Sequence, residues 1–208
     1  MRRLALTGLT FVLACSSSSG SGSSGDQSSG GSSSSGGSSS SGGSSSSGSS
    51  GSAVYAPKAW INAALGPAPA QQPCGLDGSP YVVVGAQTSP VQDGATWQNA
   101  KATISCSVKT SNGTAYDVTA SAALAGVGSV SVKGQFANGA NTTAKIVFDR
   151  TDPGTFEDDN CTVSYSTPNH GIAPGRVWAR ADCPAAVLAA QNRTCPGVIE
   201  FRFEGCAE

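Results

Sequence analysis

The chain has 208 residues, of which twelve are Lys or Arg, thirteen are Asp or Glu, seven are Cys and one is His. Its formal net charge of −1 supplies no positive field for binding phosphates, so a nucleic-acid partner is disfavoured. No apolar run reaches the about 20 residues that a membrane-spanning helix requires.

The first segment has the pattern of an export signal. Arg2 and Arg3 precede a short apolar stretch, residues 4–14, that ends directly before Cys15. The end of this stretch, Val-Leu-Ala-Cys, resembles the bacterial lipobox, in which the cysteine takes a diacylglycerol and becomes the first residue after cleavage. An ordinary secretory signal with a coincidental cysteine is the alternative. We expect residues 1–14 to be a lipoprotein signal peptide and Cys15 to be the lipidation site.

A linker of extreme composition follows. Residues 16–52 are Ser or Gly at every position except Asp26 and Gln27. Such a composition cannot bury enough apolar area to offset its chain entropy, so residues 15–52 are expected to form a lipidated, flexible tether. Loss of Arg2 and Arg3 with the signal leaves ten basic against thirteen acidic side chains. The residue after Cys15 is Ser16 and not the Asp that is associated with inner-membrane retention, which favours the outer membrane.

Residues 53–208 have the length of one ordinary domain. Residues 58–65 are ambiguous, because Trp60, Ile61, Ala64 and Leu65 have helical spacing over a short length. Beyond them, alternating apolar residues and regular turns predict strands. The predicted strands are residues 81–85, 101–109, 116–124, 128–136, 143–149, 161–166, 176–183 and 198–206.

The clearest hairpin joins residues 101–109 to residues 116–124 through the turn Ser111-Asn112-Gly113. Residues 184–192 have an alanine-rich composition that predicts one or two helical turns. About eight short strands with turns about every 8 to 12 residues predict an all-β fold, either an antiparallel β-sandwich or a Greek-key barrel.

Six cysteines follow Cys15, and an even number in an exported chain is typical of disulfides. They are Cys74, Cys106, Cys161, Cys183, Cys195 and Cys206. Fifteen pairings are possible, and neighbours in sequence are favoured: Cys74 with Cys106, Cys161 with Cys183, and Cys195 with Cys206. A zinc site is disfavoured, since there is no C-x-x-C pair and only one histidine.

Several motifs together resemble a known group of proteins. They are the lipobox with its Ser/Gly tether, the Gly94 turn before S-C-S-V, the G-R-V-W strand that ends in Cys183-Pro184, and the closing F-x-F-E-x-C. This combination resembles uncharacterised lipoproteins of myxobacteria. The resemblance implies a location and a disulfide-containing β domain, and it implies no activity.

His170 is the one histidine that a Ser-His-Asp or Cys-His site could use, and its neighbours have loop composition. A solvated side chain is the simpler interpretation. Five acidic residues lie earlier in the chain, on the expected connection between two strands, and could together hold Ca²⁺ or supply a glycosidase pair. They are Asp149, Asp152, Glu157, Asp158 and Asp159. The simpler interpretation is again a solvated loop.

The sequence therefore favours a non-enzymatic interaction or structural module that is lipid-anchored in the cell envelope, with no cofactor and with an unspecified protein or glycan partner. The alternatives are a carbohydrate- or calcium-dependent binding module that uses the acidic loop with an exposed Trp60 or Trp97, and an extracellular hydrolase. We expect Trp178 to face the core.

Overall fold

The computed structural model describes residues 56–66 and 74–208. The predicted signal peptide, Cys15 and the Ser/Gly tether lie outside the described residues. The described part forms twelve strands and one 3₁₀ turn. They are β1 (Lys58–Leu65), β2 (Pro80–Val84), β3 (Val91–Gln92), β4 (Thr96–Trp97), β5 (Ala100–Thr110), β6 (Ala115–Leu124), β7 (Gly128–Ala137), β8 (Thr142–Asp149), β9 (Phe156–Ser164), β10 (Gly171–Ala173), β11 (Arg176–Leu188), η1 (Ala189–Gln191) and β12 (Arg193–Glu204).

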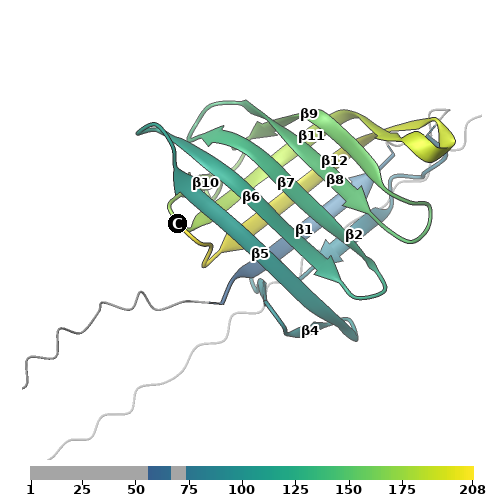
Figure 1. Ribbon diagram of the computed structural model, residues 1–208, viewed down its shortest axis with the longest axis horizontal. Coiled ribbons are helices and arrows are strands. Elements are labelled where there is room, and N and C mark those ends of the chain that lie inside the picture. The colour runs from purple at the N-terminus through teal and green to yellow at the C-terminus, as the bar shows by residue number, and fades with distance from the viewer. Residues whose placement is uncertain (1–55, 67–73) are drawn as a thin grey trace, which may run out of the picture. The chain divides into compact units, whose positions relative to one another are not determined.

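The strands form one antiparallel sheet that is nearly closed into a barrel (Figure 1). The strand order is β2-β1-β12-β11-β9-β8-β7-β6-β5-β4, with β10 added to β11 and β3 added to β1. From β4 to β9 each strand pairs with the next one in the chain, and the sheet then continues through β11 and β12 to β1 and β2. The predicted all-β class is confirmed. Of the two architectures considered, a sandwich and a barrel, the sheet has the form of a barrel.

The core is built by the alternation along each strand. On β5, Ala102, Ile104, Cys106 and Val108 are buried, as the period of two predicts, while Thr103 faces solvent. Five phenylalanines fill much of the interior and are fully buried, each contributing about 1.5–3 kcal/mol through burial. They are Phe136, Phe148, Phe156, Phe201 and Phe203.

Two segments differ from their helical expectation. Residues 58–65 form β1, where Ala59, Ile61 and Ala63 are fully buried at a spacing of two between β12 and β2. Residues 184–192 do not form the predicted helix. β11 continues to Leu188 and pairs with the start of β12, and helical backbone is limited to η1. Pairing on both sides outweighs the helix propensity of the alanines.

The six cysteines form three disulfides, as predicted, but with a different pairing. Cys161 is bonded to Cys183, in agreement with the expectation. Cys74 is bonded to Cys195, and Cys106 to Cys206, so the other two expected pairs are wrong. Preference for sequence neighbours fails here because closure of the sheet brings the last strand beside the first ones.

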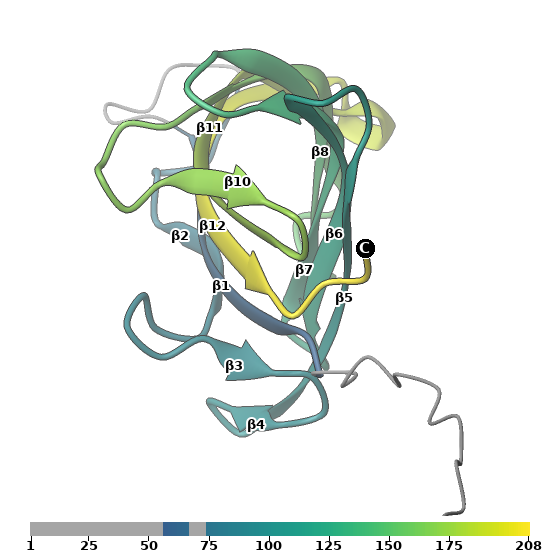
Figure 2. The same ribbon diagram turned by 90° about the vertical axis from the view of Figure 1, so that its left-hand side faces the viewer.

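The C-terminal segment closes one end of the barrel along β5 (Figure 2). The amide of Val108 donates to the carbonyl of Ala207 at 2.9 Å, and the amide of Ala207 donates to the carbonyl of Cys106 at 2.9 Å. The Cys106–Cys206 disulfide joins the same two segments covalently. At the other end of β5, the Asp93 carboxylate accepts the amide of Ile104 at 2.7 Å. The backbone groups on the side of β5 that faces away from β6 are therefore largely hydrogen-bonded. This matters because an open sheet edge invites pairing with other chains.

Two tyrosines, the buried Tyr81 and the partly buried Tyr165, predict how stability depends on pH. Tyr81 donates its hydroxyl to the carbonyl of Gly154, and its ring packs edge-on against Phe156. Burial raises the pKa of Tyr81 to about 12, and burial raises the pKa of Tyr165 to about 12. Because the unfolded phenol ionises near pH 10, the stability that each neutral phenol contributes is present below pH 10 and is lost as the pH rises toward 12.

Denaturant unfolding at a series of alkaline pH values measures this effect. We expect the free energy of unfolding to fall from pH 10 to 12, and to fall less steeply in Tyr81→Phe, which has no phenol to ionise. An equal slope in the variant would show that Tyr81 does not contribute.

Candidate functional site

A small polar pocket lies beside the pairing of β10 with the start of β11. Its volume is about 260 Å³. It is lined by the turn between β7 and β8, by β10 and the segment that leads into it, and by residues of β11 and β12. The lining residues are Asn138, Pro168, Asn169, His170, Gly171, Ile172, Arg176, Val177, Trp178, Arg202, Phe203 and Glu204.

Arg202 organises one wall of the pocket. In the sheet register it is paired with Trp178 on β11 and with Trp60 on β1. Its guanidinium lies 4.8 Å from the centroid of the Trp178 ring, and its Nε lies 2.8 Å from Oε1 of Glu204. Its Nη1 donates to the carbonyl of Gln87 at 2.9 Å. These contacts hold the guanidinium in one position and neutralise its charge.

His170 also lines the pocket, and it differs from its expectation as a solvated residue. Its side chain is 1% exposed. The amide of Ser166 donates to Nδ1 at 3.1 Å, and Nε2 lies 3.1 Å from Oε1 of Glu200. Because Nδ1 accepts a hydrogen bond, the neutral ring carries its proton on Nε2 and donates it to Glu200. Both nitrogens are engaged, and the ring also packs 5.7 Å from Trp178.

The expectation that Trp178 faces the core is wrong. Val177 and Ala179 on either side are buried in the interior, so Trp178 points to the outer face of β11 and is partly exposed. Trp60 makes an edge-on contact with it at 6.3 Å and is only 7% exposed. Trp97 is half-buried against the core. The two tryptophans proposed for an exposed binding surface are therefore not freely exposed.

The acidic run does not form one site, and three of its members do not lie on a loop. β9 begins at Phe156, so Glu157, Asp158 and Asp159 alternate along a strand. Glu157 and Asp159 bind Lys145 on the outside and raise the pKa of its ammonium. Asp149 instead accepts a hydrogen bond from Thr155. This divergence leaves no shared shell of oxygens for a calcium ion among these residues.

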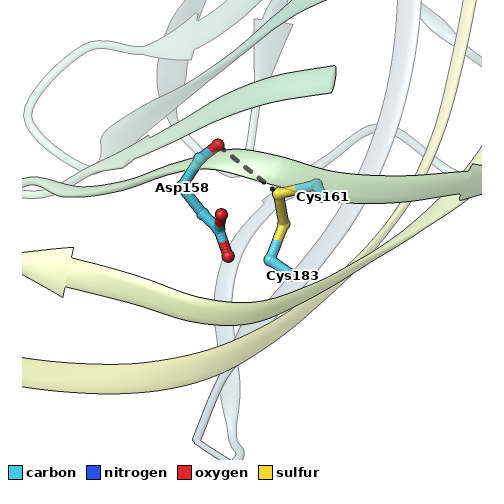
Figure 3. Close-up of side chains that lie close together, drawn as sticks. All are labelled: Asp158, Cys161 and Cys183. Atoms are coloured by element: carbon cyan, nitrogen blue, oxygen red, sulfur yellow. Dashed lines mark hydrogen bonds between the residues drawn. A yellow bond between two sulfur atoms is a disulfide. The ribbon is translucent and has the colours of Figure 1, made fainter. Parts of the chain in front are cut away.

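Asp158 points inward beside the Cys161–Cys183 disulfide (Figure 3). It is 6% exposed, and its two carboxylate oxygens accept the amides of Asn160 at 2.8 Å and Ala185 at 2.9 Å. Its ligand atoms lie within 4.8 Å of both sulfurs. Since the sulfurs are bonded to each other, they are not thiolates, and the cluster has the chemistry of a structural contact and not of a metal site.

The sequence predicted the strand at residues 198–206 but not the pocket that it lines. Glu200, Arg202 and Glu204 alternate with buried residues on β12, and Arg202 binds Glu204 within the same strand. Arg176 and Asn138 lie far from β12 in the chain, and no pattern near them in the sequence indicated that they line a pocket. The spacing of residues within one strand does not reveal which loops fold over it.

Comparison of the chain with protein-family models, with curated proteins and with solved structures found no match. Among the described residues, no helix is long and apolar enough to cross a membrane. The resemblance to myxobacterial lipoproteins stays a prediction, and the functional argument depends on the geometry of the pocket and on the chemistry of its residues.

Proposed function

We propose that this chain is an exported, lipid-anchored protein of the cell envelope whose β domain is a non-catalytic interaction module. Two features support the export of the chain. The N-terminal segment has the pattern of a lipoprotein signal ending at Cys15. Three disulfides in the described domain are typical of an oxidising compartment outside the cytoplasm. Ser16 favours the outer membrane as the destination.

The observation that carries the non-catalytic part is the state of His170. It is the one histidine of the chain, its side chain is 1% exposed, and both of its nitrogens already have hydrogen-bond partners. A general base must reach the proton that it removes, which a buried and fully engaged imidazole does not do. A hydrolase mechanism based on this residue has no support in the geometry.

The carboxylates of the pocket lead to the same interpretation. A glycosidase needs two carboxyl groups about 5–9.5 Å apart on either side of the scissile bond. Glu204 is the one carboxylate among the residues that line the pocket, and it is bound by Arg202. The pocket therefore has the composition of a binding site and lacks the pair that glycoside hydrolysis requires.

The anchor is tested by Cys15→Ser in the full chain, followed by membrane fractionation and intact-mass measurement. We expect the native chain to begin at Cys15, to carry acyl chains and to fractionate with membranes, because the thiol is the atom that takes the lipid. The serine variant is expected to lose the acyl mass and to leave the membrane fraction. Ser16→Ala is the matched control, since it changes the next residue and keeps the thiol.

Two results would contradict the proposal. A native chain that retains Met1, or six free cysteines in its mass map, would remove the argument for export. Hydrolysis of a peptide, ester or glycoside by the full chain that is abolished by Glu204→Gln would show that the domain is an enzyme.

A further inference from the structure

We infer that the pocket beside Trp178 binds a neutral saccharide, one sugar ring at a time. This inference rests on the proposed function, since it names the ligand of a domain that we propose to be a binding module. It follows from the charge, the polar groups, the aromatic wall and the size of the pocket.

The charges of the pocket are nearly balanced. Arg202 is paired with Glu204, and the buried His170 is hydrogen-bonded to Glu200. Arg176 is the charged lining residue that has no ion pair among the described side chains. One guanidinium beside a neutralised pair does not form the cluster of positive charge that a phosphate or a polyanion requires. The balance favours a ligand without net charge.

The remaining polar groups are suited to hydroxyls. Arg176 offers several N–H donors in a planar fork, and the amides of Asn138 and Asn169 each offer a donor and an acceptor. Glu204 uses one oxygen for Arg202, which leaves its second oxygen as an acceptor. Groups that donate and accept side by side match the neighbouring hydroxyls of a sugar ring, each of which also donates and accepts.

The wall beside these groups is apolar and held in place. Pro168 and Ile172 line the pocket beside Trp178, whose ring is covered on one side by the guanidinium of Arg202, and a sugar has apolar C–H groups on the faces of its ring. Trp178 is fixed by Arg202, by the edge of Trp60 and by His170. A wall that is already ordered loses little entropy on binding, which raises affinity for a small ligand.

The size of the pocket limits the ligand to a small one. Pockets for drug-sized ligands usually have about 300–1,000 Å³. The volume of about 260 Å³ lies just below that range, so we expect a monosaccharide or the end of a longer chain.

The first test compares two arginines of β11 by calorimetric titration of the full chain with glucose, galactose, mannose and N-acetylglucosamine. Arg176 lines the pocket, whereas Arg180 lies four residues further on the same face and binds Asp182. We expect saturable binding of at least one sugar, about tenfold weaker or more in Arg176→Gln, because hydrogen bonds from charged groups are the strong ones. Arg180→Gln is expected to change the affinity less than about twofold.

The second test fills the pocket without removing a polar group. A Cβ added at Gly171 would meet only Oδ1 of Asn138, at 3.9 Å, so Gly171→Leu places its side chain in open pocket space. We expect it to abolish sugar binding. Thr119→Leu, on the exposed face of β6, is the matched control and is expected to bind normally.

Three results would overturn the inference. They are no binding of any of the four sugars, equal loss of binding in the control variants, and displacement of the bound sugar by inorganic phosphate, acetate or glycine. Each of them leaves the acylation of Cys15 untouched, so failure of the saccharide site is distinguishable from failure of the proposed anchor. Circular dichroism of each variant establishes that it is folded.

Discussion

Replacement of Cys106 and Cys206 by alanine is expected to open the barrel along β5 and to lower the free energy of unfolding by about 5 kcal/mol. The disulfide closes a loop with a sequence separation of 100 residues, so its loss releases much chain entropy in the unfolded state. It also joins the two segments whose amides pair at Val108 and Ala207. Local opening at these amides should accompany the global loss.

Urea unfolding under oxidising conditions measures the global effect, and native-state hydrogen exchange measures the local one. The matched control is Cys74→Ala with Cys195→Ala, whose disulfide has a sequence separation of 121 residues. Its loss should lower stability by a similar amount, about 5 kcal/mol, but leave Val108 and Ala207 protected. Equal exchange at these two amides in both variants would show that the Cys106–Cys206 bond does not hold the C-terminal segment on β5.

Replacement of Asp158 by alanine is expected to cost about 2–5 kcal/mol. The strand pairing is interrupted by two β-bulges, at which the register shifts. One lies between Ala144 and Ile146 on β8 opposite β9, and the other lies between Cys183 and Ala186 on β11 opposite β12. Such bulges leave backbone amides without ladder partners. Asp158 accepts two of them, from Asn160 and Ala185, and so satisfies both bulges with one carboxylate.

The measurement is denaturant unfolding of Asp158→Ala, Asp158→Asn and Asp159→Ala. Asp158→Asn keeps one acceptor and should lose about half as much stability as the alanine variant. Asp159 lies next in the chain, is exposed and binds Lys145, so its replacement should cost less than about 1 kcal/mol. Similar losses at Asp158 and Asp159 would contradict the bridging role, because they would show that burial and the two amides do not matter.

The sequence by itself determined the local structure of most strands. Successive side chains of a strand point to opposite faces, so the alternation of Ile104 and Val108 with Thr103 was sufficient to predict both the strand and its buried face. The turn at Ser111-Asn112-Gly113 located the hairpin because its residues favour turn conformations. The export pattern before Cys15 is equally local, and it stays a prediction because it lies outside the described residues.

Only the tertiary structure decided which strands become neighbours across the closure of the sheet. β1 pairs with β12, although most of the domain separates them in the chain, and this pairing makes residues 58–65 a strand. The same closure brings Cys106 to Cys206 and Cys74 to Cys195. No local pattern contains this information, because contacts between distant segments depend on the shape of the whole sheet.

The pocket was decided in the same way. Trp178 was expected in the core but lies on the outer face of β11, where His170 and Arg202 cover it in part. Asn138, Arg176 and Glu204 come from separate segments and meet only in the folded domain. The sequence determined most strands and their apolar faces, because these depend on neighbours in the chain, but it did not determine β1, the end of β11 or the face on which Trp178 lies. The fold decided which polar residues share a site, because that depends on distances in space.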